Sequence, residues 1–242
     1  RTFGLQLLDL RIRERFPAMQ RLRHGLLRFQ TTVFPQFQTQ YEELSMGQKP
    51  STLFVTCSDS RIVPHFITQT QPGELFIIRT AGNFVPLYGA PPSGEAATIE
   101  YAVKVLKVRE IVVCGHSHCG AISALLQPDS TKELPALRHW LAHGQHALNE
   151  LDNYRAANRL QRDLLTSLIE CNIKVQLNNL RSYPYIRSAE DCGQLTLHGC
   201  FYRFETGESF ELDESAQQFV NVAKCCDDNP LDLDIEYDLL GS

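Results

Sequence analysis

Two hydrophobic patterns alternate through the middle of the chain. Short, continuous apolar runs at residues 53–56, 75–79 and 111–114 are typical of strands buried on both faces of a parallel sheet. Between them, apolar positions recur every three or four residues, as over 99–106, which is typical of a helix that packs by one face. Strands that alternate with helices predict an α/β domain with a mainly parallel central β-sheet and flanking helices.

The N-terminal part of the chain carries a purely helical pattern. Apolar side chains recur at steps of four, three and four residues and predict an amphipathic helix. These side chains are Leu22, Leu26, Phe29 and Val33. Pro35 is expected to interrupt the helix, because proline lacks the backbone N–H that a helix interior needs. Residues 1–50 are therefore predicted to form a helical arm.

The C-terminal part begins with the apolar run 195–204, which predicts a last strand. From residue 213 the chain is acidic, and apolar and acidic residues alternate over 231–237, as in a strand added to a sheet edge or a docking segment. The chain is therefore expected to divide into the arm, a domain of residues 51–212 and an acidic tail of residues 213–242.

Size and charge narrow the class of protein. The 242 residues are enough for one α/β domain with a substantial core. The formal net charge is -5, and the sequence has no basic patch interleaved with aromatic residues, which argues against a nucleic-acid partner. No apolar run approaches the length of a membrane span.

Metal-binding side chains follow two of the predicted strands. Cys57 comes directly after the run 53–56, and His116 and Cys119 follow the run 111–114. Parallel strands end at one edge of a sheet, so the three side chains are expected to meet there. Two thiolates and one imidazole suit zinc, and three protein ligands leave a fourth position for water, as in catalytic sites. Each residue alone would also fit an ordinary buried position, but the combination favours a metal site.

Two charged residues follow the first cysteine. Asp59 adds a carboxylate near the metal, and Arg61 adds a guanidinium able to hold that carboxylate by a bidentate pair. Taken alone, this segment would also fit a helix cap with a surface ion pair. The eight cysteines do not indicate a disulfide scaffold in a chain of this length. Because zinc needs reduced thiolates, a reducing compartment, the cytoplasm, is expected.

Together the two segments resemble the signatures of a known family. Cys57-x-Asp59-x-Arg61 and His116-x-x-Cys119 are similar to the motifs of the β-class carbonic anhydrases, in particular the cyanobacterial carboxysomal members. The resemblance implies reversible hydration of carbon dioxide to bicarbonate and a proton, with Zn2+ held by Cys57, His116 and Cys119. Asp59 and Arg61 would be the catalytic residues.

The resemblance runs from about residue 19 to residue 212 and also implies a narrow substrate pocket. Gln48 would donate a hydrogen bond to a substrate oxygen, and apolar or aromatic side chains would line the slot. Taken alone, Gln48 would fit a surface loop and the lining residues an ordinary core. Gly120 could bring the following helix close to the metal. The expected substrate-binding residues are Gln48, Phe76, Ala81, Tyr101 and Gly120.

The resemblance carries expectations about fold and partners as well. It implies that the run 195–204 is a C-terminal antiparallel edge strand, and that the helical arm joins two subunits in a homodimer or a dimer-based higher oligomer. A place inside carboxysomes and contact of the tail with a carboxysome scaffold protein are further expectations. Phe54 stands where regulated members have tryptophan, so Asp59 is expected to stay off the metal.

Two other functions fit the same residues. One is hydrolysis of carbonyl sulfide or carbon disulfide on the same scaffold, because the zinc chemistry is shared and the slot selects the substrate. The other is a non-catalytic carboxysome assembly module, in which zinc only stabilises the fold. Turnover on each gas and the effect of deleting residues 213–242 would separate these alternatives from a carbonic anhydrase.

Overall fold

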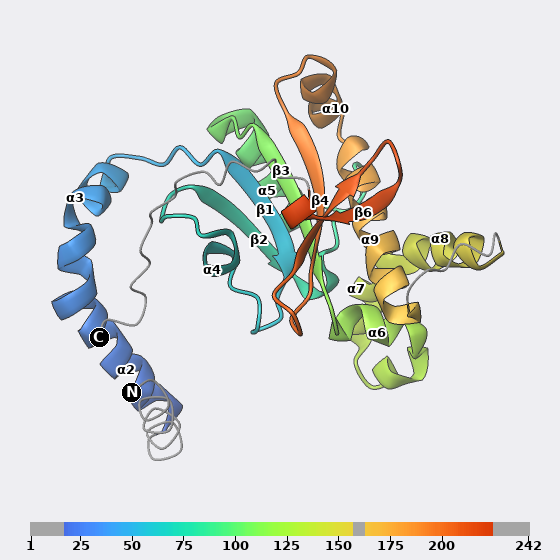
Figure 1. Ribbon diagram of the computed structural model, residues 1–242, viewed down its shortest axis with the longest axis horizontal. Helices are drawn as coiled ribbons and strands as arrows, with labels where there is room; N and C mark the ends of the chain where they lie inside the picture. The colour runs from blue at the N-terminus through green and yellow to red at the C-terminus, as the bar shows by residue number, and fades with distance from the viewer. Residues whose placement is uncertain (1–16, 157–162, 225–242) are drawn as a thin grey trace. The chain divides into compact units, whose positions relative to one another are not determined.

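The structure is a computed structural model that describes residues 17–156 and 163–224 (Figure 1). Its internal contacts divide the chain into two units, Arg1–Gln48 and Lys49–Ser242, and each unit is described by itself. The alternating pattern at residues 231–237 lies outside the described residues. Within the described part of the chain, no helix is both long enough and apolar enough to cross a membrane.

The N-terminal unit stays helical through the predicted break. Helix α2 (Ala18–Arg28) leads through a π-helical turn at Phe29–Val33 into α3 (Phe34–Ser45). The expectation that Pro35 interrupts the helix is therefore wrong. Pro35 lies in the first turn of α3, directly after the wider π-helical turn, and this shift in the hydrogen-bond ladder lets the backbone do without the proline N–H.

Aromatic rings bridge the π-helical turn of this arm. The ring centroids of Phe34 and Tyr41 lie 5.6 Å apart, and Phe29 packs against both, at 6.1 and 6.3 Å. Toward the N-terminus of the same predicted apolar stripe, Leu22 and Leu26 are each 62% exposed. The arm therefore has an aromatic cluster of its own, and the first turns of α2 present exposed apolar side chains among the described residues.

A six-stranded sheet forms the centre of the second unit, in the order β2-β1-β3-β4-β5-β6 (Figure 1). Strands β1 to β4 pair in parallel, whereas β5 and β6 are antiparallel to their neighbours. The predicted α/β fold with a mainly parallel sheet is confirmed. The strands are β1 Thr52–Cys57, β2 Leu75–Thr80, β3 Glu110–His116, β4 Thr196–Tyr202, β5 Ser209–Asp213 and β6 Gln218–Asn221.

The expected C-terminal antiparallel edge is present, but the run 195–204, which forms β4, does not supply it. β4 pairs with β3 in parallel and lies inside the sheet, so that β5 and β6 supply the antiparallel edge. A long helical connection carries the chain from β3 back to the start of a parallel neighbour, whereas short turns join β4, β5 and β6. β6 extends the sheet beyond residue 212, into the segment predicted to be a tail.

Helices pack around the parallel strands. Helix α9 lies against β3 and β4 (Figure 1). Helix α5 continues as a π-helical turn over Ala102–Leu106, and a 3-10 turn at Ala81–Asn83 follows β2. The helices are α4 Pro64–Thr68, α5 Gly94–Tyr101, α6 Gly120–Leu126, α7 Pro135–Leu141, α8 Gln145–Ala156, α9 Leu164–Arg181 and α10 Pro184–Asp191.

Two glycines let α9 approach the sheet closely. A Cβ on Gly115 of β3 would lie 2.9 Å from Ile173 Cδ1, and one on Gly199 of β4 would lie 2.9 Å from Ile173 Cγ2. Ile173 is fully buried. Asp163 caps the start of α9, because its side chain accepts a hydrogen bond from the Thr166 N–H. The helix is thereby fixed at a defined height above β3 and β4.

Candidate metal centre

The structure brings the three predicted metal ligands together. Cys57 is the last residue of β1, His116 is the last residue of β3, and Cys119 immediately precedes α6. Because β1 and β3 are parallel neighbours, their carboxyl ends lie side by side. The ligand atoms of the three residues all lie within 4.8 Å of one another, and the Cys57 and Cys119 Sγ atoms are 3.8 Å apart. All three side chains are buried.

The imidazole of His116 is held in the tautomer that a metal requires. Nδ1 lies 2.8 Å from the Ser117 carbonyl oxygen, and since a carbonyl only accepts, Nδ1 carries the proton. Nε2 is therefore the unprotonated nitrogen. It is buried, and it has no hydrogen-bond partner in the described part of the chain. A buried nitrogen without a partner is costly unless a ligand occupies it.

This donor set fits a zinc ion. Two sulfur atoms and one imidazole nitrogen are soft donors of the kind that zinc takes, and three protein ligands leave one tetrahedral position open. The carboxylate of Asp59 lies at the edge of the same cluster, with Oδ2 3.9 Å from His116 Nε2. The geometry can therefore hold a metal with a free coordination position beside a carboxylate.

The two cysteines differ in acidity. The hydrogen bond with the Cys119 thiol, against the opposing effect of burial, holds the pKa of Cys57 well below its ordinary value. The N–H of Gly82, 3.5 Å from Cys57 Sγ, acts in the same direction. The same contact with Cys57, together with burial, raises the pKa of Cys119. Cys57 is thus the thiol that ionises first, and metal binding would release the proton of Cys119.

Asp59 and Arg61 form the predicted bidentate pair. Arg61 Nε donates to Asp59 Oδ1 at 2.9 Å, and Arg61 Nη2 donates to Oδ2 at 2.8 Å. The backbone N–H of Arg61 adds a third bond to Oδ1, at 3.0 Å. The side-chain bonds from Arg61 hold the pKa of Asp59 well below its usual range, so the group is a carboxylate at neutral pH.

Two residues that the sequence patterns did not single out support this pair. Arg79, on β2, donates from Nε to the Cys57 carbonyl oxygen at 3.1 Å and from Nη2 to the Asp59 carbonyl oxygen at 2.6 Å. Phe204 places its ring 4.4 Å from the Arg61 guanidinium carbon and 5.1 Å from the His116 ring. An arginine at the carboxyl end of an apolar strand was a usable signal for Arg79. No pattern indicated Phe204, which lies beyond β4.

The predicted substrate residues divide into two groups. Ala81 directly follows β2 beside Gly82, and Gly120 begins α6 directly after Cys119, so both lie next to the ligands. Phe76 and Tyr101 pack against each other, with ring centroids 6.0 Å apart. The other predicted residue, Gln48, ends the N-terminal unit, whose placement relative to the metal centre is not described.

The Phe76–Tyr101 pair lies away from the ligands of its own chain. Phe76 pairs with Leu53, four residues before Cys57 on β1. At about 3.3 Å per residue, this register puts the pair roughly 13 Å along the strand from the ligand end. One chain therefore does not bring these two rings to the three metal ligands.

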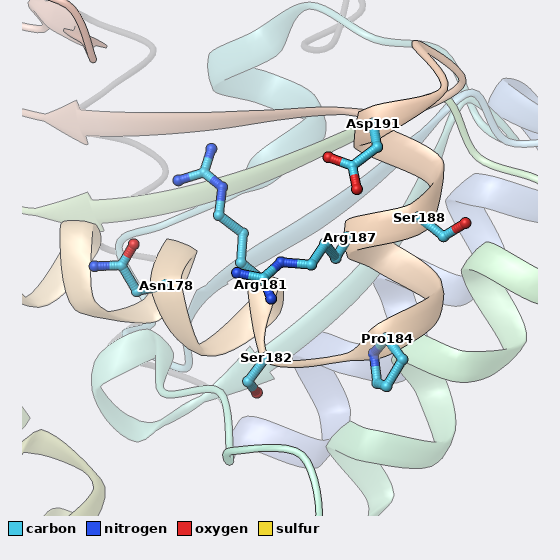
Figure 2. A pocket seen from close by; sticks show the side chains of 7 residues that line it. All are labelled: Asn178, Arg181, Ser182, Pro184, Arg187, Ser188 and Asp191. Carbon is cyan, nitrogen blue, oxygen red and sulfur yellow. The ribbon is translucent and has the colours of Figure 1, made fainter.

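A large pocket of the second unit lies elsewhere, at the turn between α9 and α10 (Figure 2). Its volume is about 570 Å3, and it contains none of the three metal ligands. Arg181 in its wall is already paired with Glu190 and Glu214, at 3.1 and 2.8 Å. We assign this pocket no part in the chemistry of the metal centre. The lining residues are Asn178, Arg181, Ser182, Pro184, Arg187, Ser188 and Asp191.

Comparisons with known proteins agree with the geometry. The family model described as carbonic anhydrase matches residues 52–209, which is more than half of the chain. A carbonic anhydrase from Pseudomonas aeruginosa is 44% identical over 200 residues, covering 83% of this chain and 90% of that protein. A solved structure, that of the β-carbonic anhydrase CcaA, superposes with a TM-score of 0.80 at 43% identity and covers 85% of this chain and 100% of that chain.

This chain belongs to the β-carbonic anhydrase family. A further relative, a carbonic anhydrase from Synechocystis, is 45% identical over 204 residues, covering 84% of this chain and 74% of that protein. A cyanobacterial and a pseudomonad carbonic anhydrase thus match at similar identity. The comparisons establish the enzyme class of this β-carbonic anhydrase.

Proposed function

We propose that this β-carbonic anhydrase holds Zn2+ with Cys57, His116 and Cys119 and hydrates carbon dioxide reversibly to bicarbonate and a proton. The observation that carries the proposal is the buried Nε2 of His116, which lacks a partner among the described residues, on a ring whose ligand nitrogen lies within 4.8 Å of both cysteine sulfur atoms. When bound, zinc would act as a Lewis acid that lowers the pKa of a water molecule toward about 7.

Asp59 and Arg61 have separate tasks in this proposal. Asp59 Oδ2 is close enough to the cluster to accept a hydrogen bond from the attacking water and orient a lone pair toward the substrate carbon. Arg61 holds both oxygens of that carboxylate, which keeps it ionised and turned away from direct metal coordination. Arg79 donates a hydrogen bond to the Asp59 carbonyl oxygen and so fixes the backbone at Asp59.

The substrate pocket supports a second proposal, that the working unit is a homodimer or a dimer-based higher oligomer. Ala81 and Gly120 would line the slot from the chain that holds the metal. Phe76 of β2 is in register with Leu53, about 13 Å along β1 from Cys57, and Tyr101 at the end of α5 packs against Phe76, so their role as pocket lining would need another subunit. Gln48 would stabilise the developing oxyanion charge. The exposed Leu22 and Leu26 of the arm support contact with a second chain.

A place in carboxysomes, inside the cytoplasm, is proposed separately. Its support is the resemblance to cyanobacterial members and the 45% identity to the Synechocystis carbonic anhydrase. Contact with a carboxysome scaffold protein would be tested by deleting residues 225–242. That deletion spares β6, which pairs with β5 in the sheet. Loss of scaffold binding with full hydration activity is expected, and scaffold binding by the deleted chain would contradict the proposal.

The proposed reaction is tested by gas turnover. The zinc-loaded chain, kept under reducing conditions, is assayed in a stopped-flow pH-indicator experiment with carbon dioxide, and in parallel with carbonyl sulfide and carbon disulfide. Rapid hydration of carbon dioxide is expected. Hydrolysis of the sulfur gases without carbon dioxide hydration would overturn the proposal in favour of a sulfur-gas hydrolase. Zinc-loaded protein that turns over none of the three gases would leave the assembly module as the function.

A further inference from the structure

One backbone segment connects the metal ligands to distant side chains. We call residues Ala81–Val85, which directly follow β2, the ligand loop. The backbone N–H of Gly82 donates to Cys57 Sγ, with 3.5 Å between the nitrogen and the sulfur, and this contact is buried. Gly82 has φ of 80°, and a Cβ there would lie 2.9 Å from the Phe84 ring, so glycine alone fits. The loop therefore brings a backbone donor to a metal ligand at a defined point.

The peptide group between Ala81 and Gly82 is also held at its carbonyl oxygen. The Ala81 carbonyl and the Gly82 N–H belong to one planar peptide unit. Trp140 of α7 donates its indole Nε1–H to the Ala81 carbonyl oxygen, at 2.8 Å. A continuous chain of hydrogen bonds thus runs from the Trp140 indole through one peptide to Cys57 Sγ. In such chains each bond polarises the next, by about 10–30% per bond.

The neighbouring peptides of the ligand loop are held by buried amides of α9. Asn172 donates to the Gly82 carbonyl oxygen at 3.1 Å, and Gln176 accepts from the Val85 N–H at 2.8 Å. Asn179 donates to the Val85 carbonyl oxygen at 2.8 Å. Gln176 Nε2 also donates to the side-chain oxygen of Asn172, Oδ1, at 2.9 Å. Because every amide nitrogen here faces an oxygen, the orientation of each side chain is fixed and the loop has little freedom to rotate.

We propose that Trp140 is a positioning residue for the metal ligand Cys57, acting through the Ala81–Gly82 peptide, with Asn172 as a second support. The indole keeps the Gly82 N–H aimed at Sγ and strengthens its donation, which stabilises the sulfur as a thiolate ligand. This inference rests on the proposed function only for the presence of a metal at Cys57, His116 and Cys119. Outer groups of this kind commonly change metal affinity by about 10- to 100-fold.

The chain offers a clean variant and a matched control. Trp140→Phe removes the indole N–H and keeps an aromatic ring at the position that packs against Phe84 and His143. Asn179→Leu is the control, because it removes a side-chain donor from the same loop at Val85, whose backbone bonds to Gln176 and Asn179 and, within the described part of the chain, makes no hydrogen bond to the metal ligands. Asn172→Ser, whose hydroxyl is too short to reach the Gly82 carbonyl, is a second test variant.

The experiment measures the bond between the ligand sulfur and the metal. Each protein is loaded with Co2+, and the thiolate-to-cobalt charge-transfer absorption is recorded, with zinc affinity measured by chelator competition. Loss of a hydrogen bond to sulfur raises the energy of its lone pair, so the charge-transfer band of Trp140→Phe is expected at longer wavelength, with zinc affinity about 10-fold weaker. Asn172→Ser should shift the band in the same direction, and Asn179→Leu should match the wild type.

The outcomes separate this inference from the proposed function. If the wild-type chain binds neither Co2+ nor Zn2+ at the three ligands, the proposed function fails. If the metal binds normally, and Trp140→Phe and Asn172→Ser keep the wild-type band and affinity, the positioning role alone is overturned. A shift of equal size in Asn179→Leu would also overturn it, because general loosening of the loop would then explain the effect. Thermal unfolding of each variant, recorded alongside, accounts for purely structural losses.

Discussion

The carboxylate of Asp59 is held by Arg61 through two side-chain hydrogen bonds of 2.9 and 2.8 Å, while its Oδ2 lies 3.9 Å from the Nε2 of His116. Asp59 Oδ2 therefore lies beside the candidate metal ligands while both oxygens of the carboxylate stay bonded to Arg61. Arg61 is half exposed, and its guanidinium also packs over the Phe204 ring. The position of Asp59 depends on the forked geometry of one arginine side chain.

Replacing the forked guanidinium of Arg61 should slow carbon dioxide hydration without removing the metal. In Arg61→Lys a single ammonium cannot make both bonds to the Asp59 oxygens, so kcat/KM for carbon dioxide hydration is expected to fall about 10- to 100-fold. Stopped-flow assays with zinc content measured on the same samples test this. Arg203→Lys is the matched control, because the Arg203 side chain pairs with Glu208 and not with Asp59. Wild-type rates in Arg61→Lys would contradict the role of the pair.

Loss of one ligand should abolish tight metal binding. Cys119→Ser replaces a soft sulfur donor with a hydroxyl that zinc binds poorly, so the variant is expected to lose zinc on dialysis against a chelator that leaves the wild type loaded. Metal analysis after dialysis measures the result. Cys192→Ser removes an exposed cysteine at the end of α10 and should retain zinc. Equal zinc contents in the two variants would argue against Cys119 as a ligand.

A histidine on the sheet should make stability depend on pH. His198 of β4 bonds to Glu211 through Nδ1, at 2.9 Å, and to Glu110 through Nε2, at 2.8 Å. Burial acts to lower the pKa of His198, but the two carboxylates outweigh it and raise that pKa above its ordinary value. The protonated ring therefore stabilises the fold. That stabilisation is complete below about pH 6.5, the unfolded value, and is lost as pH rises through the folded pKa.

The His198→Gln variant tests this dependence. The difference in unfolding free energy between wild type and variant is expected to be larger at about pH 6 than at about pH 9, because the wild type carries the charged ring only at the lower pH. Urea denaturation at both pH values measures it. A difference that stays constant, or grows toward pH 9, would contradict the raised pKa of His198.

The contact between α9 and the sheet makes a prediction about packing. Gly115→Ala and Gly199→Ala should each destabilise the fold by about 1–3 kcal/mol, because the new methyl group meets Ile173 at 2.9 Å. Ile173→Val removes Cδ1, the atom nearest to a Cβ at position 115, although Ile169 Cγ2 at 3.0 Å and Ile173 Cγ1 at 3.1 Å remain there. It keeps Cγ2, the atom nearest to a Cβ at position 199. Combined with Ile173→Val, Gly115→Ala should therefore recover part of its loss, whereas Gly199→Ala should not.

Urea unfolding of the single and double variants gives the two coupling free energies. A favourable coupling at position 115 together with none at position 199 is the expected result. Equal couplings at both positions would mean that α9 shifts as a rigid body to relieve either clash. That result would contradict the fixed height of α9 above β3 and β4.

The clustering of the candidate metal ligands could be predicted because it follows largely from strand direction. Cys57 and His116 come at the ends of apolar runs, and parallel strands end at one edge, so local pattern was enough to place them together. The sequence pattern did not show in the same way whether β4 runs parallel or antiparallel to its neighbours. A strand's own residues do not state whether it runs parallel or antiparallel, because this depends on the length and path of the preceding connection.

Contacts between distant residues account for what the sequence patterns missed. Trp140 and Ala81 are 59 residues apart, and nothing in either segment indicates that the indole reaches the ligand loop. The sequence patterns also gave no sign that Phe76 and Tyr101 pack against each other roughly four residues along β1 from the ligand end of their own chain. Strand register is set by packing of the whole sheet, and the alternation of apolar residues does not determine it.

The most direct test of the central claim is carbon dioxide hydration by one preparation measured in three states: as purified, after removal of metal under reducing conditions, and after return of one equivalent of Zn2+. If Cys57, His116 and Cys119 hold a catalytic zinc ion, activity should vanish with the metal and return with stoichiometric zinc, and Cys119→Ser should show neither step. Hydration that persists at full rate in the metal-free chain would contradict the account.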